Sequence, residues 1–138
     1  MTVPVQDTSA LSRPQPVFFI VELQVKPGQI DDLRSVMGEM ADLTRTEEPG
    51  TLNYEWFLTE DGTACHIYER YADSAAAVVH SATFPAELGE RAQAFLPTRL
   101  TAYGTITEEI QEKRIKPLLA ALPGLRVVYL DPLGGFAR

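Results

Sequence analysis

His80 is the first residue whose chemistry suggests a function. It ends the run Ala75-Ala76-Ala77-Val78-Val79-His80, which predicts a helix of small apolar residues. An imidazole titrates near neutral pH, so His80 is suited to accept a proton from a bound molecule. The alternative is a structural histidine that hydrogen-bonds a nearby backbone group or carboxylate. The residues alone leave both roles open.

Glu69 is the second candidate, because a carboxylate is predicted among aromatic side chains. It alternates with Ile67 and Tyr71 along a predicted strand, and should therefore face the same side as Tyr54 and Trp56. Such a carboxylate is either paired, for example with an arginine, or has a raised pKa suited to acid–base catalysis. We expect the paired role, and keep Glu69 beside His80 as a candidate catalytic residue.

Three aromatic residues, Tyr54, Trp56 and Tyr71, are candidates for substrate binding. Together they would line an apolar pocket for a flat aromatic molecule, with a phenol hydroxyl available to hold a developing oxyanion. The alternative is ordinary core packing. His66 has the opposite strand parity and is expected at the surface or in a dimer contact. No group of His, Asp and Glu has metal-ligand spacing, so we expect no metal site.

The elements that position these residues follow from hydrophobic periodicity. Apolar residues at helical spacing between Gln29 and Pro49 predict one helix, and further helices are predicted over Ala75–Thr83 and Ala86–Leu96. Four strands are predicted at Val17–Val25, Leu52–Leu58, Cys65–Tyr71 and Arg99–Thr107. The order strand, helix, strand thus occurs twice. It indicates the split βαβ arrangement of a ferredoxin-like α+β sandwich.

The domain organisation follows from the same order. Residues 1–16 contain three prolines among polar residues and are expected to form a flexible arm. Residues 17–107 form the ferredoxin-like unit. Residues 108–138 add a helix, Glu108–Leu122, and a short strand, Val127–Leu130, as an extension of the same domain.

The second face of the predicted sheet is also apolar. It carries Phe18, Ile20, Phe57, Tyr68 and Tyr103. An exposed aromatic patch of this size is unusual on a soluble monomer. A second copy packed sheet to sheet about a twofold axis would cover it, so we predict a homodimer.

Composition limits the possible partners. The chain has 138 residues and a formal net charge of −7, which argues against nucleic acid and anionic membranes as partners. No apolar run is long enough to span a membrane, and Met1–Gln15 does not resemble a secretory signal. The single cysteine, Cys65, excludes an intrachain disulfide and fits the cytoplasm. It is expected to be a small buried hydrophobe.

Several motifs resemble the antibiotic biosynthesis monooxygenase (ABM) domain. They are Val25-Lys26-Pro27-Gly28, Glu48-Pro49-Gly50-Thr51-Leu52-Asn53-Tyr54, and the segment Tyr68–Ala76 leading to His80. Tyr71 stands where family members usually have tryptophan. The resemblance implies a dimeric α/β barrel. The family includes cofactor-independent monooxygenases acting on polycyclic phenols or quinols, haem-degrading relatives and an isomerase.

These considerations favour a cofactor-independent monooxygenase that oxidises an electron-rich phenol, quinol or polyketide-like aromatic with molecular oxygen. His80 or Glu69 would take the proton, and Tyr54, Trp56 and Tyr71 would bind the substrate. The alternatives are a dimeric small-molecule binding protein without turnover and a non-redox isomerase. The sequence does not identify the substrate.

Overall fold

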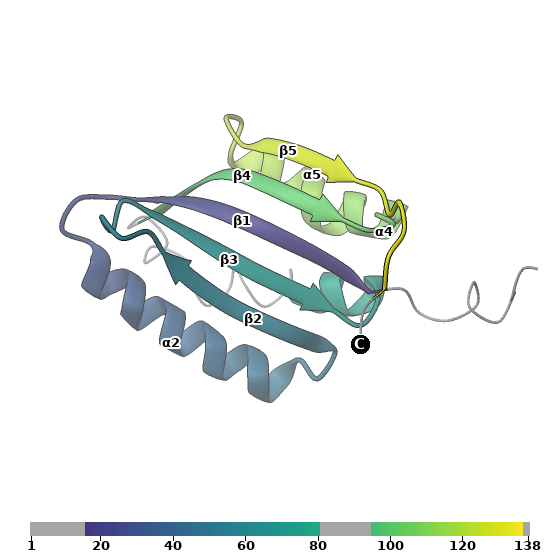
Figure 1. The fold of residues 1–138 in the computed structure, drawn as a ribbon, viewed down its shortest axis with the longest axis horizontal. Coiled ribbons are helices and arrows are strands. Elements are labelled where there is room, and N and C mark those ends of the chain that lie inside the picture. Colours follow the sequence, from purple (N-terminus) through teal and green to yellow (C-terminus); the bar gives the residue numbers. More distant parts are fainter. Residues whose placement is uncertain (1–15, 81–94, 137–138) are drawn as a thin grey trace, which may run out of the picture.

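A computed structural model describes residues 16–80 and 95–136 of the chain. The strands are β1 (Val17–Val25), β2 (Thr51–Leu58), β3 (Ala64–Tyr71), β4 (Phe95–Tyr103) and β5 (Arg126–Leu130). The helices are α2 (Ile30–Glu47), α4 (Glu108–Ile110), the π-helical turn η2 (Gln111–Ile115) and α5 (Lys116–Ala121) (Figure 1). A further helix begins at Ser74 and is described as far as His80. None of the described helices is long and apolar enough to cross a membrane.

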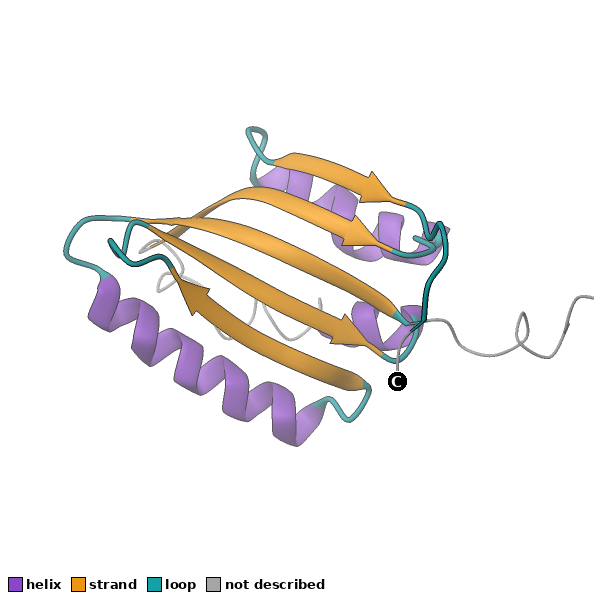
Figure 2. Cartoon of the chain, viewed as in Figure 1, coloured by secondary structure: helices purple, strands orange, loops and turns teal. Residues whose placement is uncertain are grey.

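The strands form one sheet with the order β2-β3-β1-β4-β5. β1 lies in the centre and pairs antiparallel with both β3 and β4, while β5 joins β4 in parallel. The sequence therefore correctly predicts an α+β fold of the ferredoxin-like type, with β5 added at one edge. Figure 2 shows the helices behind and beside the sheet, and no described helix in front of it.

The core lies on the covered face of the sheet. β1 alternates along its length between buried residues and residues that are half-buried or, at Gln24, exposed, as its sequence predicts. The odd-numbered residues Phe19, Val21 and Leu23 point into the core, where they meet Ile67 and Tyr71 of β3. α2 covers this side with Leu33, Val36 and Met40, each almost fully buried.

The fourth strand differs from the prediction. β4 begins at Phe95, so the predicted helix is wrong for Phe95 and Leu96, and its remainder lies outside the described residues. Pro97 does not stop a helix. It lies within the strand next to a register shift in β1, where β5 does not pair with β4. The strand ends at Tyr103 rather than Thr107, because Gly104 takes a φ of +106°.

The C-terminal helix is continuous from α4 to α5 but contains one wide turn. Pro117 has no N–H and cannot continue the regular hydrogen-bond pattern. In the turn before it, the N–H of Lys116 instead donates to the carbonyl of Gln111. This wider turn buries Ile110, Arg114 and Ile115 together on the side that faces the sheet.

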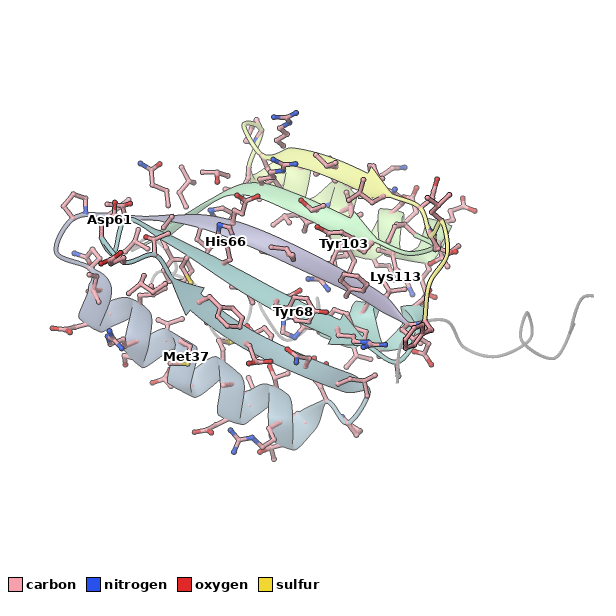
Figure 3. The ribbon with its side chains drawn as sticks, in the orientation of Figure 1. Met37, Asp61, His66, Tyr68, Tyr103 and Lys113 are labelled. Carbon is pink, nitrogen blue, oxygen red and sulfur yellow. The ribbon has the colours of Figure 1, made fainter. Side chains whose placement is uncertain are left out.

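The other face of the sheet is lined by the aromatic residues that the strand parity predicts there. Phe18 stacks on Tyr103 with ring centroids 4.5 Å apart, and Tyr68 lies 5.8 Å from Phe18. Figure 3 shows Tyr68, Tyr103 and His66 over the strands on the side turned toward the reader. Within this one chain Phe57 remains 55% exposed.

Candidate functional site

His80 lies in the core at the end of the described part of its helix. Asp73 caps that helix by accepting a hydrogen bond from the Ala76 N–H. The His80 side chain is almost fully buried, and its Nδ1 lies 2.9 Å from Oε1 of Glu48. The structure thus places a carboxylate against His80.

Glu48 reaches His80 because of the turn that follows α2. Glu48 ends the helix, and its Oε1 also accepts a hydrogen bond from the Thr51 hydroxyl at 3.2 Å. Gly50 lies against the His80 helix so closely that a Cβ there would be 2.7 Å from Cβ of Ala76. The Glu-Pro-Gly sequence therefore brings the turn and the histidine helix together.

Glu69 lies on the other side of the imidazole. Its Oε1 is 3.6 Å from Nε2 of His80, and its Oε2 accepts hydrogen bonds from the Tyr71 hydroxyl at 2.9 Å and from Arg114. Burial alone would raise the pKa of Glu69. The positive charge of Arg114, followed by His80 and by the hydrogen bonds, holds that pKa below its ordinary value. The paired role expected for Glu69 is the one the geometry shows.

Arg114 supplies the cation of this pair from the C-terminal helix. Its Nη2 lies 2.5 Å from Oε2 of Glu69, and its Nη1 donates to the carbonyl of Ala77 at 3.3 Å. The guanidinium also stacks on aromatic rings, 4.3 Å from the centroid of Phe19 and 5.3 Å from that of Tyr71. Burial by itself would lower the pKa of Arg114, whereas Tyr71 and Glu69 raise it above its ordinary value.

Tyr54 and Trp56 border the cluster from β2. The Tyr54 ring is 5.0 Å from the His80 ring and meets the Trp56 ring edge-on at 5.9 Å. Tyr54 is also the direct cross-strand neighbour of Glu69. Burial, with the charge of Glu69, raises the pKa of Tyr54, while the nearby Trp56 indole lowers it slightly. Tyr54 therefore stays protonated, and its hydroxyl is available to donate a hydrogen bond.

Three buried polar atoms of this region have no hydrogen-bond partner in the described structure. They are Oη of Tyr54, Nε1 of Trp56 and Oε2 of Glu48. The first two are donors and the third is an acceptor, so a bound molecule with both an acceptor and a donor group would satisfy them. The described residues contain no group of His, Cys, Asp and Glu arranged to hold a metal ion.

The structure brings the five sequence-predicted residues to one region. His80 contacts Glu69, Tyr54 and Tyr71 directly, and Trp56 joins them through Tyr54. Sequence reasoning missed Glu48 and Arg114. The signal for Glu48 was present in the motif before Gly50, but was interpreted only as a turn. For Arg114 the only signal in the sequence was its position on the side of the C-terminal helix that faces the core.

Comparisons with known proteins identify a family. The sequence profile of the antibiotic biosynthesis monooxygenase (ABM) family matches residues 16–97, which are 82 of the 138 residues. No curated protein matches the chain.

Solved structures share the fold. MupZ from Pseudomonas fluorescens has a TM-score of 0.71 at 20% identity, and the match covers 90% of this chain and 95% of MupZ. Rv0793 from Mycobacterium tuberculosis has a TM-score of 0.53 at 26% identity, covering 68% of this chain and 98% of Rv0793. A candidate antibiotic biosynthesis monooxygenase from Caulobacter crescentus CB15 has a TM-score of 0.58 at 20% identity, covering 70% of this chain and 95% of that protein. The match to MupZ covers a larger share of the chain than residues 16–97 do. It therefore includes residues outside the segment that matches the family profile.

Proposed function

The chain belongs to the antibiotic biosynthesis monooxygenase family, and on that premise we propose that it oxidises an electron-rich phenol, quinol or polyketide-like aromatic with molecular oxygen, without a cofactor. The observation that carries this proposal is the buried His80–Glu48 pair next to the unpartnered hydroxyl of Tyr54. A buried imidazole held by a carboxylate is a suitable proton acceptor, and a fixed donor beside it is suited to bind the substrate oxygen.

The proposed reaction begins with proton transfer from the substrate hydroxyl to His80. The carboxylates of Glu48 and Glu69, on either side of the ring, stabilise the imidazolium that forms. The substrate anion then donates electrons to molecular oxygen and forms a carbon–oxygen bond, and the resulting peroxide takes the proton back from His80 to give a hydroperoxide. Loss of water leaves a quinone, so one oxygen atom enters the product, the other leaves as water, and the substrate supplies all the electrons.

Tyr54, Trp56 and Tyr71 are assigned to substrate binding. The Tyr54 hydroxyl and the Trp56 indole N–H would both donate to the substrate oxygen as negative charge develops on it. Their rings, together with Tyr71, would contact the flat face of the aromatic molecule. Because Glu69 already neutralises Arg114, the described cluster offers no unpaired cation for a phosphate or carboxylate group. A neutral aromatic substrate therefore fits better than an anionic one.

Oxygen uptake with a panel of quinols and anthrones tests the reaction. His80→Ala should abolish turnover, and His66→Gln is a matched control, because His66 is the other histidine and is half-exposed. Uptake that survives His80→Ala removes His80 from the mechanism. Saturable binding without oxygen uptake would favour the non-catalytic alternative. Conversion of a ligand without oxygen uptake would favour the isomerase.

The proposal includes a homodimer formed through the aromatic face of the sheet. Phe18, Phe57, Tyr68 and Tyr103 lie there, and a second copy would cover them. Sedimentation at micromolar concentration should show a dimer. Phe57→Lys should dissociate it, whereas Leu133→Lys, a fully exposed residue beyond β5, should not. A monomeric wild-type chain would contradict this part of the proposal. The single Cys65 keeps the cytoplasm as our predicted location.

A further inference from the structure

We infer that Arg114 is a positioning residue of this site, so that the C-terminal helix completes a site whose other residues lie within the family segment 16–97. The inference rests on the proposed function for its catalytic consequence only. Its structural part concerns how Arg114 orients Glu69 and controls the charge around His80.

The orientation follows from how the two oxygens of Glu69 are used. Arg114 and Tyr71 both donate to Oε2, which leaves Oε1 facing Nε2 of His80 at 3.6 Å. Arg114 also donates to the carbonyl of Ala77, which is on the same helix as His80 and three residues before it. One guanidinium therefore fixes the carboxylate and the helix that carries the imidazole. Its planar fork can make both contacts at once.

The C-terminal helix is shaped for this contact. Arg114 lies in the wide turn η2, between the buried residues Ile110 and Ile115. Its guanidinium lies over the rings of Phe19 and Tyr71, so the charged group is enclosed on the covered face of the sheet. Wide turns of this kind occur often at functional sites.

The charge balance around His80 depends on Arg114. The charged and titratable groups that face His80 from the described elements are Glu48 after α2, Tyr54 on β2, and Glu69 and Tyr71 on β3. Arg114 contacts Oε2 of Glu69, whereas Oε1 of the same carboxylate faces His80. Without it, the two buried carboxylates that flank the imidazole would lose the positive charge that balances one of them. The His80–Glu69 pair would then hold an extra proton at neutral pH, and His80 would be a poorer proton acceptor.

The test follows the protonation of the pair directly. In a His66→Gln background His80 is the only histidine, so its ring ¹⁵N shifts and the Glu69 carboxyl ¹³C shift report the titration without ambiguity. Arg114→Met should raise the pH at which the His80–Glu69 pair takes up its proton by about one to two units. Arg114→Lys keeps the positive charge, so most of this rise should be absent in that variant. Lys113→Met, which removes an exposed charge from the same helix, should leave it unchanged.

Glu69→Gln keeps the inference testable if Arg114→Met does not fold. It should move the His80 titration to lower pH, and addition of Arg114→Met to it should then have a smaller effect than Arg114→Met has beside Glu69, because the carboxylate that Arg114 orients is gone. Titrations of His80 and Glu69 that do not move in a folded Arg114→Met variant would overturn the inference. If the titrations move as expected but no quinol is oxidised by the wild-type chain, the positioning role stands and the proposed function fails.

Discussion

Gly50→Ala tests whether the turn after α2 and the His80 helix are in the close contact that the site requires. A methyl group at residue 50 would lie 2.7 Å from Cβ of Ala76. An ordinary carbon–carbon contact is about 3.5–4.0 Å, so the turn or the helix must move by about 1 Å. Neither Cβ atom can rotate away, because both are fixed to the backbone. The movement would lengthen the 2.9 Å contact between Glu48 and His80.

The magnitude follows from two opposing terms. Overpacking a core contact costs about 1–3 kcal/mol. Replacing glycine by alanine also stiffens the unfolded chain, which stabilises the protein by about 0.4–1 kcal/mol. We therefore expect Gly50→Ala to lower the free energy of unfolding by about 0.5–2 kcal/mol. Ala76→Gly alone should cost about 1 kcal/mol, because it places a glycine within the helix.

The assay is urea unfolding of the two single variants and the double variant Gly50→Ala/Ala76→Gly. The double variant removes the clashing methyl group and should recover about 1 kcal/mol relative to the sum of the single changes. The same variant should restore the activity that Gly50→Ala reduces. Additive effects in the double variant would refute the reasoning, because they would show that the two residues are not in contact.

Three further predictions concern Glu69, Tyr54 and Cys65. The depressed pKa of Glu69 means that its contribution to stability is present above the pKa of an unfolded glutamate and is lost as pH falls through the folded pKa. Acid unfolding curves of wild type and Glu69→Gln should therefore converge at low pH, and a constant difference would contradict this. Tyr54→Phe removes a buried hydroxyl without a partner, so the free energy of unfolding should stay equal or rise by up to about 1 kcal/mol, while affinity for 1-naphthol falls. A marked loss of stability would reveal a partner for that hydroxyl. Burial raises the pKa of the Cys65 thiol to about 11, so Ellman's reagent should react with it only in denaturant, and fast labelling of the native protein would disprove this.

The sequence correctly predicts a strand or helix when the residues within it are enough to set its bounds. β1 has the predicted bounds, because its alternation is regular and Pro27-Gly28 ends it. β4 was harder to predict, since a proline within a strand is tolerated only where the neighbouring strand does not need its N–H. That condition depends on where β5 begins, opposite Arg99, and the local sequence does not contain this information.

The site was predicted in part, for a related reason. Strand parity places Glu69 with Tyr54 and Trp56, because the side of a strand that a residue faces follows directly from its position. Glu48 is 32 residues from His80, and Arg114 is 45 residues from Glu69. Contacts at such separations depend on how the turn and the C-terminal helix pack onto the sheet. The local sequence pattern identified Glu69 as a buried carboxylate that requires a partner, but it did not identify Arg114 as that partner.

The polar cluster is difficult to explain as a contribution to stability. Replacement of a buried ion pair by apolar side chains of similar size is often neutral or stabilising by about 1–4 kcal/mol. Unpartnered buried groups such as the Tyr54 hydroxyl and the Trp56 N–H cost about 1–3 kcal/mol each. The neighbouring core is filled by Phe19 and Ile67, so the same face of the sheet accepts apolar residues where stability alone decides. The buried Glu69–Arg114 pair and the unpartnered atoms of Tyr54, Trp56 and Glu48 gather where the turn after α2, the strands β2 and β3, the His80 helix and the C-terminal helix meet. Such a local departure from apolar packing is expected of a site that binds a ligand and moves its proton.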